Sequence, residues 1–284
     1  MLNSPRISIV IPNHNGCGYL ENCLRSLLAQ TCAPMEIVIV DNASSDRNLG
    51  FAGGANAGIR AARGDWVAIL NNDTEAAADW LSECARAVRD HPDAAFLACK
   101  ILDFRDRGLL YSAGDCFLRA GIGYRRGQEQ RDRPDLSIEC EIFSASGCAA
   151  LYSARALRDA GGFDERFFAY LEDVDLGLRL QAAGHRGYYI PSAEVYHHGA
   201  ATSGGEFSPL AVRLRTRNAL LLLLKSIPVP MLLRWMPLIL FAQAAWLIRA
   251  ARHGRLAAYI RALAEAFLLA PAMVRARRRL RKHW

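Results

Sequence analysis

Polar side chains follow three short apolar runs near the start of the chain, and these are the first residues that could bind a ligand. The runs are "ISIVI" at 7–11, "EIVIV" at 36–40 and "DWVAIL" at 65–70. Ligands of open α/β sheets bind at the carboxyl ends of the strands, so we expect the residues after these runs to line one pocket. They are Pro12, Asn13, His14, Asp41, Asn71, Asn72 and Asp73.

A second group of acids lies at the expected start of a helix, in "YLEDVDLGLRL". The helix dipole favours a charged carboxylate at this end, so Asp173 is predicted to be ionised at pH 7 and able to accept a proton. Asp175 has a simpler interpretation, because it precedes Arg179 by four residues and can form a surface ion pair with it. Two acids such as Asp73 and Asp173 also serve in glycosidic-bond hydrolysis. The three strand-end motifs argue against a hydrolase.

The apolar runs also predict the elements that must position these side chains. Their β-branched residues indicate buried strands, and leucines recur at helical spacing over 19–30. A strand, a helix and a second strand in this order form the first unit of an α/β fold with a mostly parallel sheet. We expect a further helix over 76–89 and short strands around 95–101.

Charge divides the chain into two parts. The formal net charge is +7, but residues 213–284 hold 15 Lys or Arg against one acid, Glu265, which gives +14 there and −7 in the remainder. We therefore expect an acidic body over 1–210 and a basic, apolar segment over 211–284 that seeks an anionic partner. The eight cysteines include no C-x-x-C pair, and the N-terminal apolar run is too short for a secretory signal. Both features predict a cytoplasmic location.

The basic segment is predicted to lie on a membrane rather than to cross it. Its longest run without charge, 235–248, has 14 residues, whereas about 20 are needed to span a bilayer. Two or three helices in the interface, with arginines on lipid phosphates and with Trp235, Trp246 and Trp284 at the boundary, are the favoured interpretation. The alternatives are a soluble helical subdomain docked on the body or on a homodimer partner, and a re-entrant hairpin broken at Pro237. Nucleic-acid binding is disfavoured by the tryptophans and leucines of this segment.

Seven segments of the chain carry a resemblance to a known family. They are, in order, "SIVIPNHNG", "VIVDNASSD", "NLGFAGGANAGI", "AILNNDT", "GCAALYSARAL", "GGFDERFFAYLEDVDLGLRL" and "VYHHGAATSG". Together they resemble the family 2 glycosyltransferases of the GT-A fold, especially bacterial enzymes that build rhamnose- or hexose-containing surface polysaccharides. The resemblance implies a Rossmann-like catalytic domain over 1–210 that transfers a sugar, with inversion, from a nucleoside-diphosphate sugar of the dTDP-rhamnose or UDP-hexose class. It also implies a saccharide or lipid-linked acceptor in cell-envelope polysaccharide synthesis.

The chain departs from the family pattern after Asp46. Family members usually place a helix and another strand between their "DNxSxD" turn and "NxGFAxGxNxG", whereas here Asp46 and Arg47 lead directly to Asn48. We therefore expect one helix and one edge strand to be missing, which leaves the strand over 36–40 as an exposed sheet edge. This departure keeps open a second interpretation, a nucleotide-sugar-binding relative without turnover.

The resemblance assigns a metal site for Mn²⁺ or Mg²⁺. Asp73 ends the segment that matches the family's D-x-D-like motif, which makes it the metal ligand, and an oxygen site with open positions suits either ion. His197 and His198 resemble the family's late histidine, which completes the metal site or contacts the diphosphate. Adjacent side chains in an extended segment point in opposite directions, so only one can face the metal, and we favour His198.

The resemblance also assigns the catalytic and donor-binding residues. Asp173 matches the general base of the family's E-D motif, and Glu172 beside it orients the site or the acceptor. "GFAGGANAG" supplies a helix start near the diphosphate, and no G-K-[ST] follows it, which excludes an ATP-binding loop. Asp41 is implied to accept a hydrogen bond from the nucleotide base, and His14 stands where relatives often have an aromatic. The full set of predicted donor-binding residues is Pro12, Asn13, His14, Asp41 and Asn72.

Overall fold

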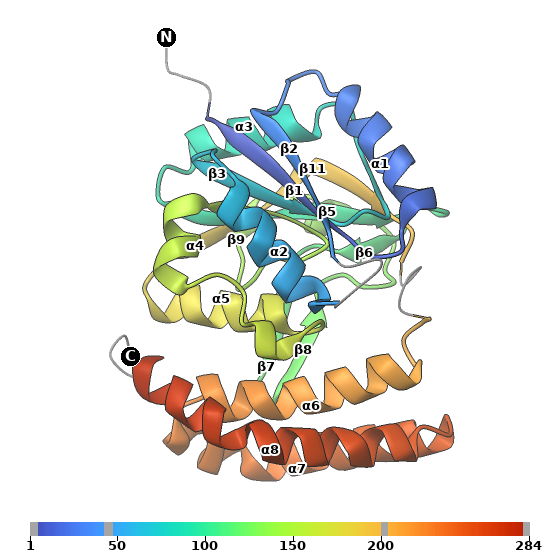
Figure 1. Cartoon of the computed structure of the whole chain (residues 1–284), viewed down its shortest axis with the longest axis vertical. Helices are drawn as coiled ribbons and strands as arrows, with labels where there is room; N and C mark the ends of the chain where they lie inside the picture. The colour runs from blue at the N-terminus through green and yellow to red at the C-terminus, as the bar shows by residue number, and fades with distance from the viewer. Residues whose placement is uncertain (1–4, 43–47, 200–203, 281–284) are drawn as a thin grey trace.

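The structure is a computed structural model that describes residues 5–42, 48–199 and 204–280. Figure 1 shows a central sheet with helices on both sides and the C-terminal helices packed below. The first unit consists of β1 (Ile7–Asn13), α1 (Cys17–Leu28) and β2 (Glu36–Asp41). β1 and β2 are parallel, so the predicted β-α-β unit is confirmed, with its helix two residues nearer the N-terminus than expected.

Five further strands extend this unit into a mixed sheet. They are β3 (Trp66–Leu70), β4 (Thr74–Ala76), β5 (Ala94–Asp103), β10 (Ala149–Ser153) and β11 (Arg186–His197). The main path through the sheet is β2-β1-β3-β10-β5-β11-β4. β3 lies parallel to β1 and β11 parallel to β5, whereas β10 is antiparallel to both of its neighbours. The predicted α/β class is confirmed.

The segment between β5 and β10, about which the sequence says little, forms short elements. They are β6 (Leu110–Ser112), β7 (Asp115–Leu118), β8 (Ile122–Arg125), the 3-10 turn η1 (Pro134–Leu136) and β9 (Cys140–Glu141). β6 pairs with β5 and β9 with β11, while β7 and β8 form a separate hairpin. None of these strands exceeds four residues, which is too short for a readable alternation of apolar and polar side chains.

Alternate residues of each strand point to opposite faces of the sheet and pack into two apolar cores, one on each face. Ile9 packs with α1 and α3, whereas its neighbour Val10 packs with α2, α4 and α5. This gives the three layers visible in Figure 1. The bounds of the covering helices are α2 (Gly50–Ala61), α3 (Trp80–Asp90), α4 (Ala154–Ala160) and α5 (Glu172–Ala182), with the 3-10 turn η2 (Glu165–Phe167) before α5.

β2 forms one end of the sheet. Among the described residues it pairs with β1 alone, and its residue Ile39 is 45% exposed. This arrangement is what the missing helix and strand predict. Residues 43–47, which include Asp46, lie outside the described ranges.

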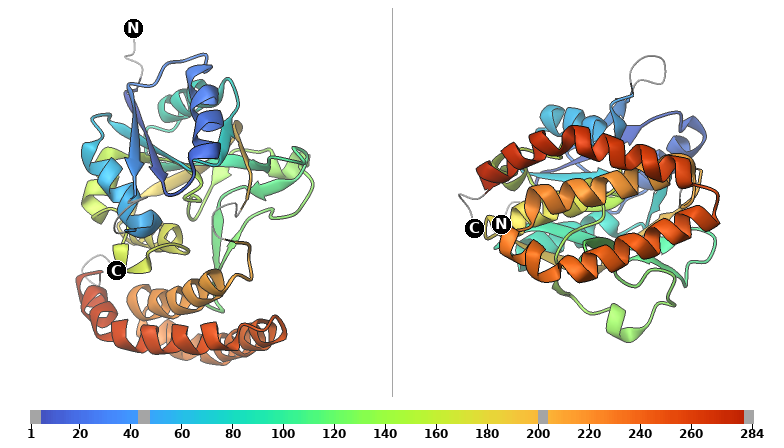
Figure 2. Two further views of the ribbon diagram at one scale, coloured as in Figure 1. Left: turned by 45° about the vertical axis from the view of Figure 1, so that its right-hand side comes forward. Right: turned by 90° about the horizontal axis from the view of Figure 1, so that it is seen from below.

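The C-terminal segment forms the helices α6 (Pro209–Ser226), α7 (Val229–Arg252) and α8 (Leu256–Leu280). α6 packs on η2 and α5 in one apolar cluster with α8, and Figures 1 and 2 show α7 and α8 lying along its far side. α7 is 24 residues long, because the helix continues past the charge-free run through Arg234 and Arg249. By length and composition α7 and α8 could each cross a membrane, but these two properties alone do not establish a span.

Candidate active site

Asn13 and Asn72 meet side chain to side chain at the carboxyl ends of β1 and β3. Nδ2 of Asn72 donates a hydrogen bond to Oδ1 of Asn13 over 2.6 Å. Gly16, just before α1, packs against this pair, and a Cβ atom there would lie 1.8 Å from Nδ2 of Asn72. Two of the predicted donor-binding residues are therefore together at the end of the sheet where α/β proteins bind ligands.

The other predicted donor-binding residues lie beside this pair. Pro12 precedes Asn13 in β1, and Asn13 is paired in register with Asp41 at the end of β2. Asp41 is exposed. Nδ1 of His14 lies 3.2 Å from the carbonyl oxygen of Asn42. The strand ends thus gather all five predicted residues along one edge.

Asn42 connects two elements beside these residues and was not predicted from the sequence. Its Oδ1 accepts a hydrogen bond from the backbone N–H of Leu49 over 3.0 Å, and its Nδ2 donates to the carbonyl oxygen of Gly50 over 2.6 Å. These bonds tie the end of β2 to the start of α2. An asparagine directly after the strand-ending Asp41 was the available signal, because asparagine side chains commonly bond nearby backbone in turns.

Asp73 and His197 form a buried pair. Oδ1 of Asp73 lies 3.1 Å from Nε2 of His197, and the short strand β4 causes this, since Thr74 pairs with His197 across the sheet. The strand β4 was not predicted from the sequence. The predicted helix over 76–89 is present but begins later, at Trp80. Burial tends to raise the pKa of Asp73, but the hydrogen bond and charge of His197 outweigh burial and hold that pKa below its ordinary value. Asp73 is therefore a carboxylate at neutral pH.

His198 lies among aromatic rings. Its ring stacks on Phe104 with centroids 3.7 Å apart and tilts against Tyr19 at 5.1 Å, while its backbone N–H donates to the carbonyl oxygen of Asp73 over 3.1 Å. Burial lowers the pKa of His198 from its ordinary value, so the imidazole is neutral at pH 7. The sequence favours His198 as the metal ligand, whereas the ring that contacts the Asp73 carboxylate is that of His197.

The chemistry of these side chains suits a divalent cation. Carboxylate oxygen is a ligand that suits Mn²⁺ and Mg²⁺, and Nε2 of His197 lies 3.1 Å from the carboxylate of Asp73. Within the described residues no three His, Cys, Asp or Glu side chains converge as a complete metal-binding group. A cation held by Asp73 and one histidine keeps positions open for water and for the oxygens of a substrate.

Asp173 lies half-buried in the first turn of α5, and backbone groups fix its carboxylate. Gly147 donates its N–H to Oδ2 over 3.0 Å, and the N–H of Val174 donates to Oδ1 over 2.8 Å. The hydroxyl of Ser144 donates to the backbone carbonyl of Asp173 over 2.9 Å. The carboxylate is therefore held in one orientation while part of it stays accessible.

Two further acids are buried against Asp173. Burial and the negative charge of Asp173 raise the pKa of Glu172 well above its ordinary value. The same two causes, burial first, raise the pKa of Asp115 at the start of β7. Both carboxyl groups therefore keep their protons to higher pH than exposed acids do. Asp115 was not predicted from the sequence, because an acid in a turn-rich stretch carries no local sign of burial.

Backbone hydrogen bonds connect the strand-end group to the acidic helix start. The N–H of Asn71 donates to the carbonyl oxygen of Cys148 over 2.9 Å, and the preceding residue, Gly147, is the one that holds Asp173. The antiparallel pairing of β10 with β3 produces this neighbourhood. The structure thus brings the Asn71–Asp73 segment and Asp173, which are about a hundred residues apart in the sequence, to the same edge of the sheet.

The predicted ion pair between Asp175 and Arg179 is confirmed, but the prediction that this pair lies on the surface is wrong. Asp175 accepts a hydrogen bond from Nε of Arg179 over 2.9 Å, four residues later on the same helix. It is fully buried, because α6 covers it and Nζ of Lys225 donates to it over 2.7 Å. A contact across 50 residues leaves no trace in the local pattern around Asp175.

Comparison with known proteins identifies the family. The family model described as "Glycosyl transferase family group 2" matches residues 66–274, and the model "Glycosyl transferase family 2" matches residues 8–47. An N-acetylglucosaminyl-diphospho-decaprenol L-rhamnosyltransferase of Mycobacterium tuberculosis is 28% identical over 242 residues, which cover 70% of this chain and 78% of that protein.

Two other relatives are much longer than this chain. The uncharacterised protein y4gI of Sinorhizobium fredii is 29% identical over 243 residues, which cover 74% of this chain and 26% of that protein. The O-antigen biosynthesis protein RfbC of Myxococcus xanthus is 28% identical over 242 residues, which cover 73% of this chain and 18% of that protein. The chain therefore spans about a quarter or less of these two relatives.

Solved structures show the same fold at low sequence identity. The mannosyltransferase PcManGT of Pyrobaculum calidifontis, in complex with GDP-Man and Mn²⁺, has a TM-score of 0.54 and 19% identity, and the match covers 99% of this chain and 86% of that one. GalNAc-T7 with UDP, GalNAc and Mn²⁺ has a TM-score of 0.61 and 16% identity over 76% of this chain and 48% of that one. The chain is a glycosyltransferase of the family 2 group, and its catalytic fold is of the GT-A type.

Proposed function

We propose that this glycosyltransferase moves a sugar, with inversion, from a nucleoside-diphosphate sugar to a saccharide or lipid-linked acceptor in cell-envelope polysaccharide synthesis. The observation that carries the proposal is the position of the Asp173 carboxylate on the same sheet edge as Asn13, Asn72 and Asp73. The name of the M. tuberculosis relative specifies L-rhamnose and a diphospho-decaprenol acceptor. It therefore supports a donor of the dTDP-rhamnose class, with UDP-hexose as the other candidate.

In the proposed reaction, an acceptor hydroxyl attacks the anomeric carbon from the face opposite the nucleotide. The new bond joins the acceptor oxygen to that carbon, the bond to the diphosphate oxygen breaks, and the hydroxyl proton goes to Asp173. One displacement inverts the anomeric configuration. The N–H groups of Gly147 and Val174 fix the orientation of this carboxylate, and Glu172 would help to orient the acceptor.

We infer that a divalent cation, Mn²⁺ or Mg²⁺, is held by Asp73 with His198 or His197. When bound, it would neutralise charge on the departing diphosphate, which is the main electrostatic requirement of such a reaction. The Asp73 carboxylate is buried, ionised and close to both histidines. Pro12, Asn13, His14, Asp41 and Asn72 would hold the nucleotide side of the donor, and these residues together form the proposed donor site.

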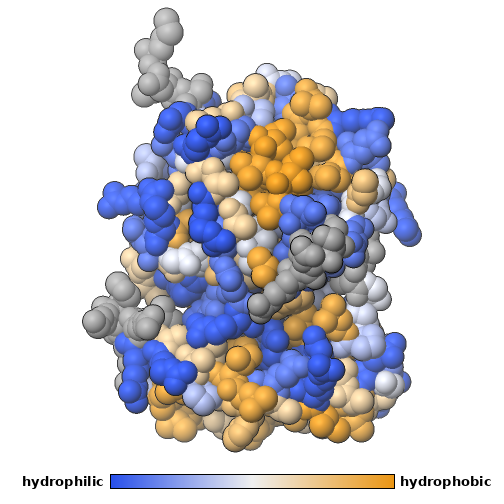
Figure 3. Space-filling model, in the orientation of Figure 1, coloured by the Kyte–Doolittle hydropathy of each residue, from blue (hydrophilic) through white to orange (hydrophobic). Residues whose placement is uncertain are grey.

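We further propose that α7 and α8 rest on the inner face of the plasma membrane, with the catalytic domain over 1–210 in the cytoplasm and residues 211–284 as the membrane-bound part. Leu233, Leu240 and Phe241 of α7 and Phe267 and Leu268 of α8 are each more than 60% exposed. Figure 3 shows apolar side chains along the lower rim, where these helices lie, interspersed with hydrophilic ones. Apolar residues flanked by arginines favour an anionic lipid surface over nucleic acid.

A thermal-shift panel of nucleotide sugars, run with and without Mn²⁺, tests the proposed donor class. A ligand that binds only the folded chain adds about 2.7 kcal/mol to the free energy of unfolding when it is present at a hundred times its Kd. The melting temperature rises as a result. We expect dTDP-rhamnose or a UDP-hexose to stabilise the protein, and to do so more strongly with Mn²⁺. An accepted donor should then be consumed with acceptor present. Binding without consumption would instead indicate a nucleotide-sugar-binding relative.

A further inference from the structure

The segment just before the proposed base has a backbone conformation that side-chain-bearing residues rarely adopt. Phe168, Tyr170 and Leu171 have φ angles of 66°, 69° and 65°, and none of them is glycine. Residues in this region of φ persist only where their surroundings fix them. The next two residues are Glu172 and Asp173, so whatever holds this segment also sets the position of the catalytic carboxylate.

Two buried side chains of α6 supply that support. Nδ2 of Asn218 lies 2.9, 2.8 and 2.6 Å from the carbonyl oxygens of Phe167, Ala169 and Tyr170. Nη2 of Arg217 donates to the carbonyl oxygen of Phe167 over 2.6 Å and to that of Arg166 over 3.1 Å. Nε of Arg217 also donates to Oδ1 of Asn218 over 2.9 Å, so each of the two side chains orients the other.

The donor side of the active site holds the same segment from the opposite direction. The carbonyl oxygen of Phe168 accepts a hydrogen bond from the N–H of Ala52, in the first turn of α2, over 3.0 Å. A Cβ atom on Gly50 would lie 2.4 Å from that oxygen. Residues 167–171 are therefore fixed between the start of α2 and the middle of α6.

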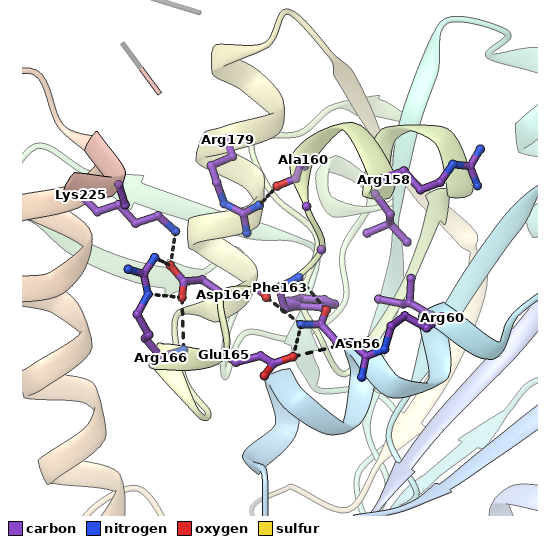
Figure 4. Close-up of a pocket in the computed structure, with 15 residues that line it drawn as sticks. Asn56, Arg60, Arg158, Ala160, Phe163, Asp164, Glu165, Arg166, Arg179 and Lys225 are labelled. Atoms are coloured by element: carbon purple, nitrogen blue, oxygen red, sulfur yellow. Dashed lines mark hydrogen bonds and ion pairs between the residues drawn. The ribbon is translucent and has the colours of Figure 1, made fainter. Parts of the chain in front are cut away.

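An ion-pair group ties the end of α6 to the residues around the base. Figure 4 shows Lys225 of α6 and Arg166 of η2 both pointing at Asp164, at the side of a pocket of about 640 Å³ that none of the predicted donor, metal or catalytic residues lines. Nζ of Lys225 lies 2.6 Å from Asp164 and 2.7 Å from Asp175. Asp164 precedes the base and Asp175 follows it, so Lys225 of α6 pairs with an acid on each side of the proposed base in the sequence.

We infer that Arg217 and Asn218 are positioning residues for Glu172 and Asp173, and that α6 therefore belongs to the catalytic unit of the proposed transferase. The inference rests on the proposed function in so far as Asp173 is the base. It also links the base to the proposed membrane-facing helices. Glu265 of α8, the one acid within residues 213–284, lies 3.5 Å from Nη1 of Arg217.

Steady-state kinetics of α6 variants with a water-soluble acceptor test this inference. Arg217→Met removes the guanidinium that donates to the 167–171 segment but keeps an unbranched apolar stem, and Asn218→Leu removes the amide donor at nearly constant side-chain volume. We expect kcat to fall about 10- to 100-fold, the scale of a small displacement of a catalytic group, while the donor KM stays within about twofold, because Asn13, Asn72 and Asp73 are untouched. Arg217→Lys restores a donor and should recover part of kcat.

Arg215→Met is the matched control. Arg215 lies on the same helix, but its side chain pairs with Glu206 over 2.9 Å and does not contact the 167–171 segment. We expect kcat of this variant to equal that of the wild type. Unchanged kcat in both Arg217→Met and Asn218→Leu, or a loss equal to that of Arg215→Met, would overturn the inference.

Hydrogen exchange separates this inference from the proposed function, because it needs no turnover. In Arg217→Met, and in Asn218→Leu where that variant folds, the amides of Phe168, Ala169 and Asp175 should exchange faster than in the wild type, while those of β1 and β3 should not change. Normal protection of these three amides contradicts the positioning role even if the wild type transfers no sugar. A wild type without turnover but with the local change in exchange would refute the proposed function alone.

Discussion

Gly147 donates its backbone N–H to Oδ2 of Asp173 over 3.0 Å, so the loop before β10 holds the carboxylate that we propose as the base. A Cβ atom at position 147 would lie 3.0 Å from the ring of Phe51 and 3.6 Å from that oxygen. The contact with the oxygen is ordinary, but the contact with the Phe51 ring is tight, so we predict that Gly147→Ala shifts this loop and its N–H relative to Asp173 and lowers kcat about tenfold with little change in donor Kd. Gly18→Ala is a suitable control, since a Cβ there meets nothing within 4 Å. Equal kcat in the two variants would show that the contact with Gly147 is not needed.

Single alanine variants should identify which histidine acts with Asp73. Asp73→Ala is expected to abolish the Mn²⁺ dependence of donor binding, because the diphosphate loses its shared cation. The histidine that helps to hold the cation should reproduce this loss when it is replaced, and the other should affect mainly stability. Isothermal titration of donor with and without Mn²⁺ measures the difference. If donor titrations of Asp73→Ala with and without Mn²⁺ match those of the wild type, the cation is bound elsewhere.

The pKa of Asp115 predicts a pH dependence of stability. Its folded-state pKa is raised, by burial first and by the charge of Asp173 second, so between its unfolded and folded pKa values the folded state binds more protons than the unfolded state. Stability is therefore lost as pH rises from about 4 towards the folded pKa. Asp115→Asn removes this loss, so its melting temperature should fall less than that of the wild type between about pH 5 and pH 8. Parallel curves for the two proteins would show that Asp115 is ionised in the fold.

The exposed apolar side chains of α7 and α8 predict a salt-resistant part of membrane binding. Phe241 and Phe267 are 73% and 80% exposed. The double variant Phe241→Ser/Phe267→Ser should lose more liposome binding at high salt than at low salt, because charge attraction is screened and apolar burial is not. Ile138→Ser, at a 62% exposed position on the body, is the control. Flotation assays with anionic liposomes measure both. An unsubstituted chain that stays free of such liposomes at low salt would favour a soluble helical subdomain.

The sequence predicted those features of the fold and site that are encoded locally. The β-branched runs located β1, β2 and β3, and the polar residues after them do lie together at the ends of these strands. Features that are short, or that depend on contacts between distant segments, were not predicted. β4 has three residues, too few for a period, yet its pairing with β11 places Asp73 beside His197.

Contacts between distant segments explain the remaining differences. Asp175 is buried by Lys225 and the 167–171 segment is held by Asn218, and both partners lie in a helix that composition alone separates from the body. The basic segment appears distinct from the body by charge, but α6 contributes packing and hydrogen bonds to both. A boundary at residue 210 remains a prediction about domains, and the contacts of α6 cross it.

The most direct test of the proposed mechanism is to compare the rate and stereochemistry of sugar transfer by the wild type and by Asp173→Asn. Both proteins would be assayed with Mn²⁺, the donor that stabilises the fold and a soluble acceptor, and NMR would report the anomeric configuration of the product. The proposed mechanism predicts inversion of that configuration, and a rate for Asp173→Asn about 10² to 10⁴ lower, with folding and donor Kd preserved. Retention of configuration, or near-normal turnover by Asp173→Asn, would contradict it.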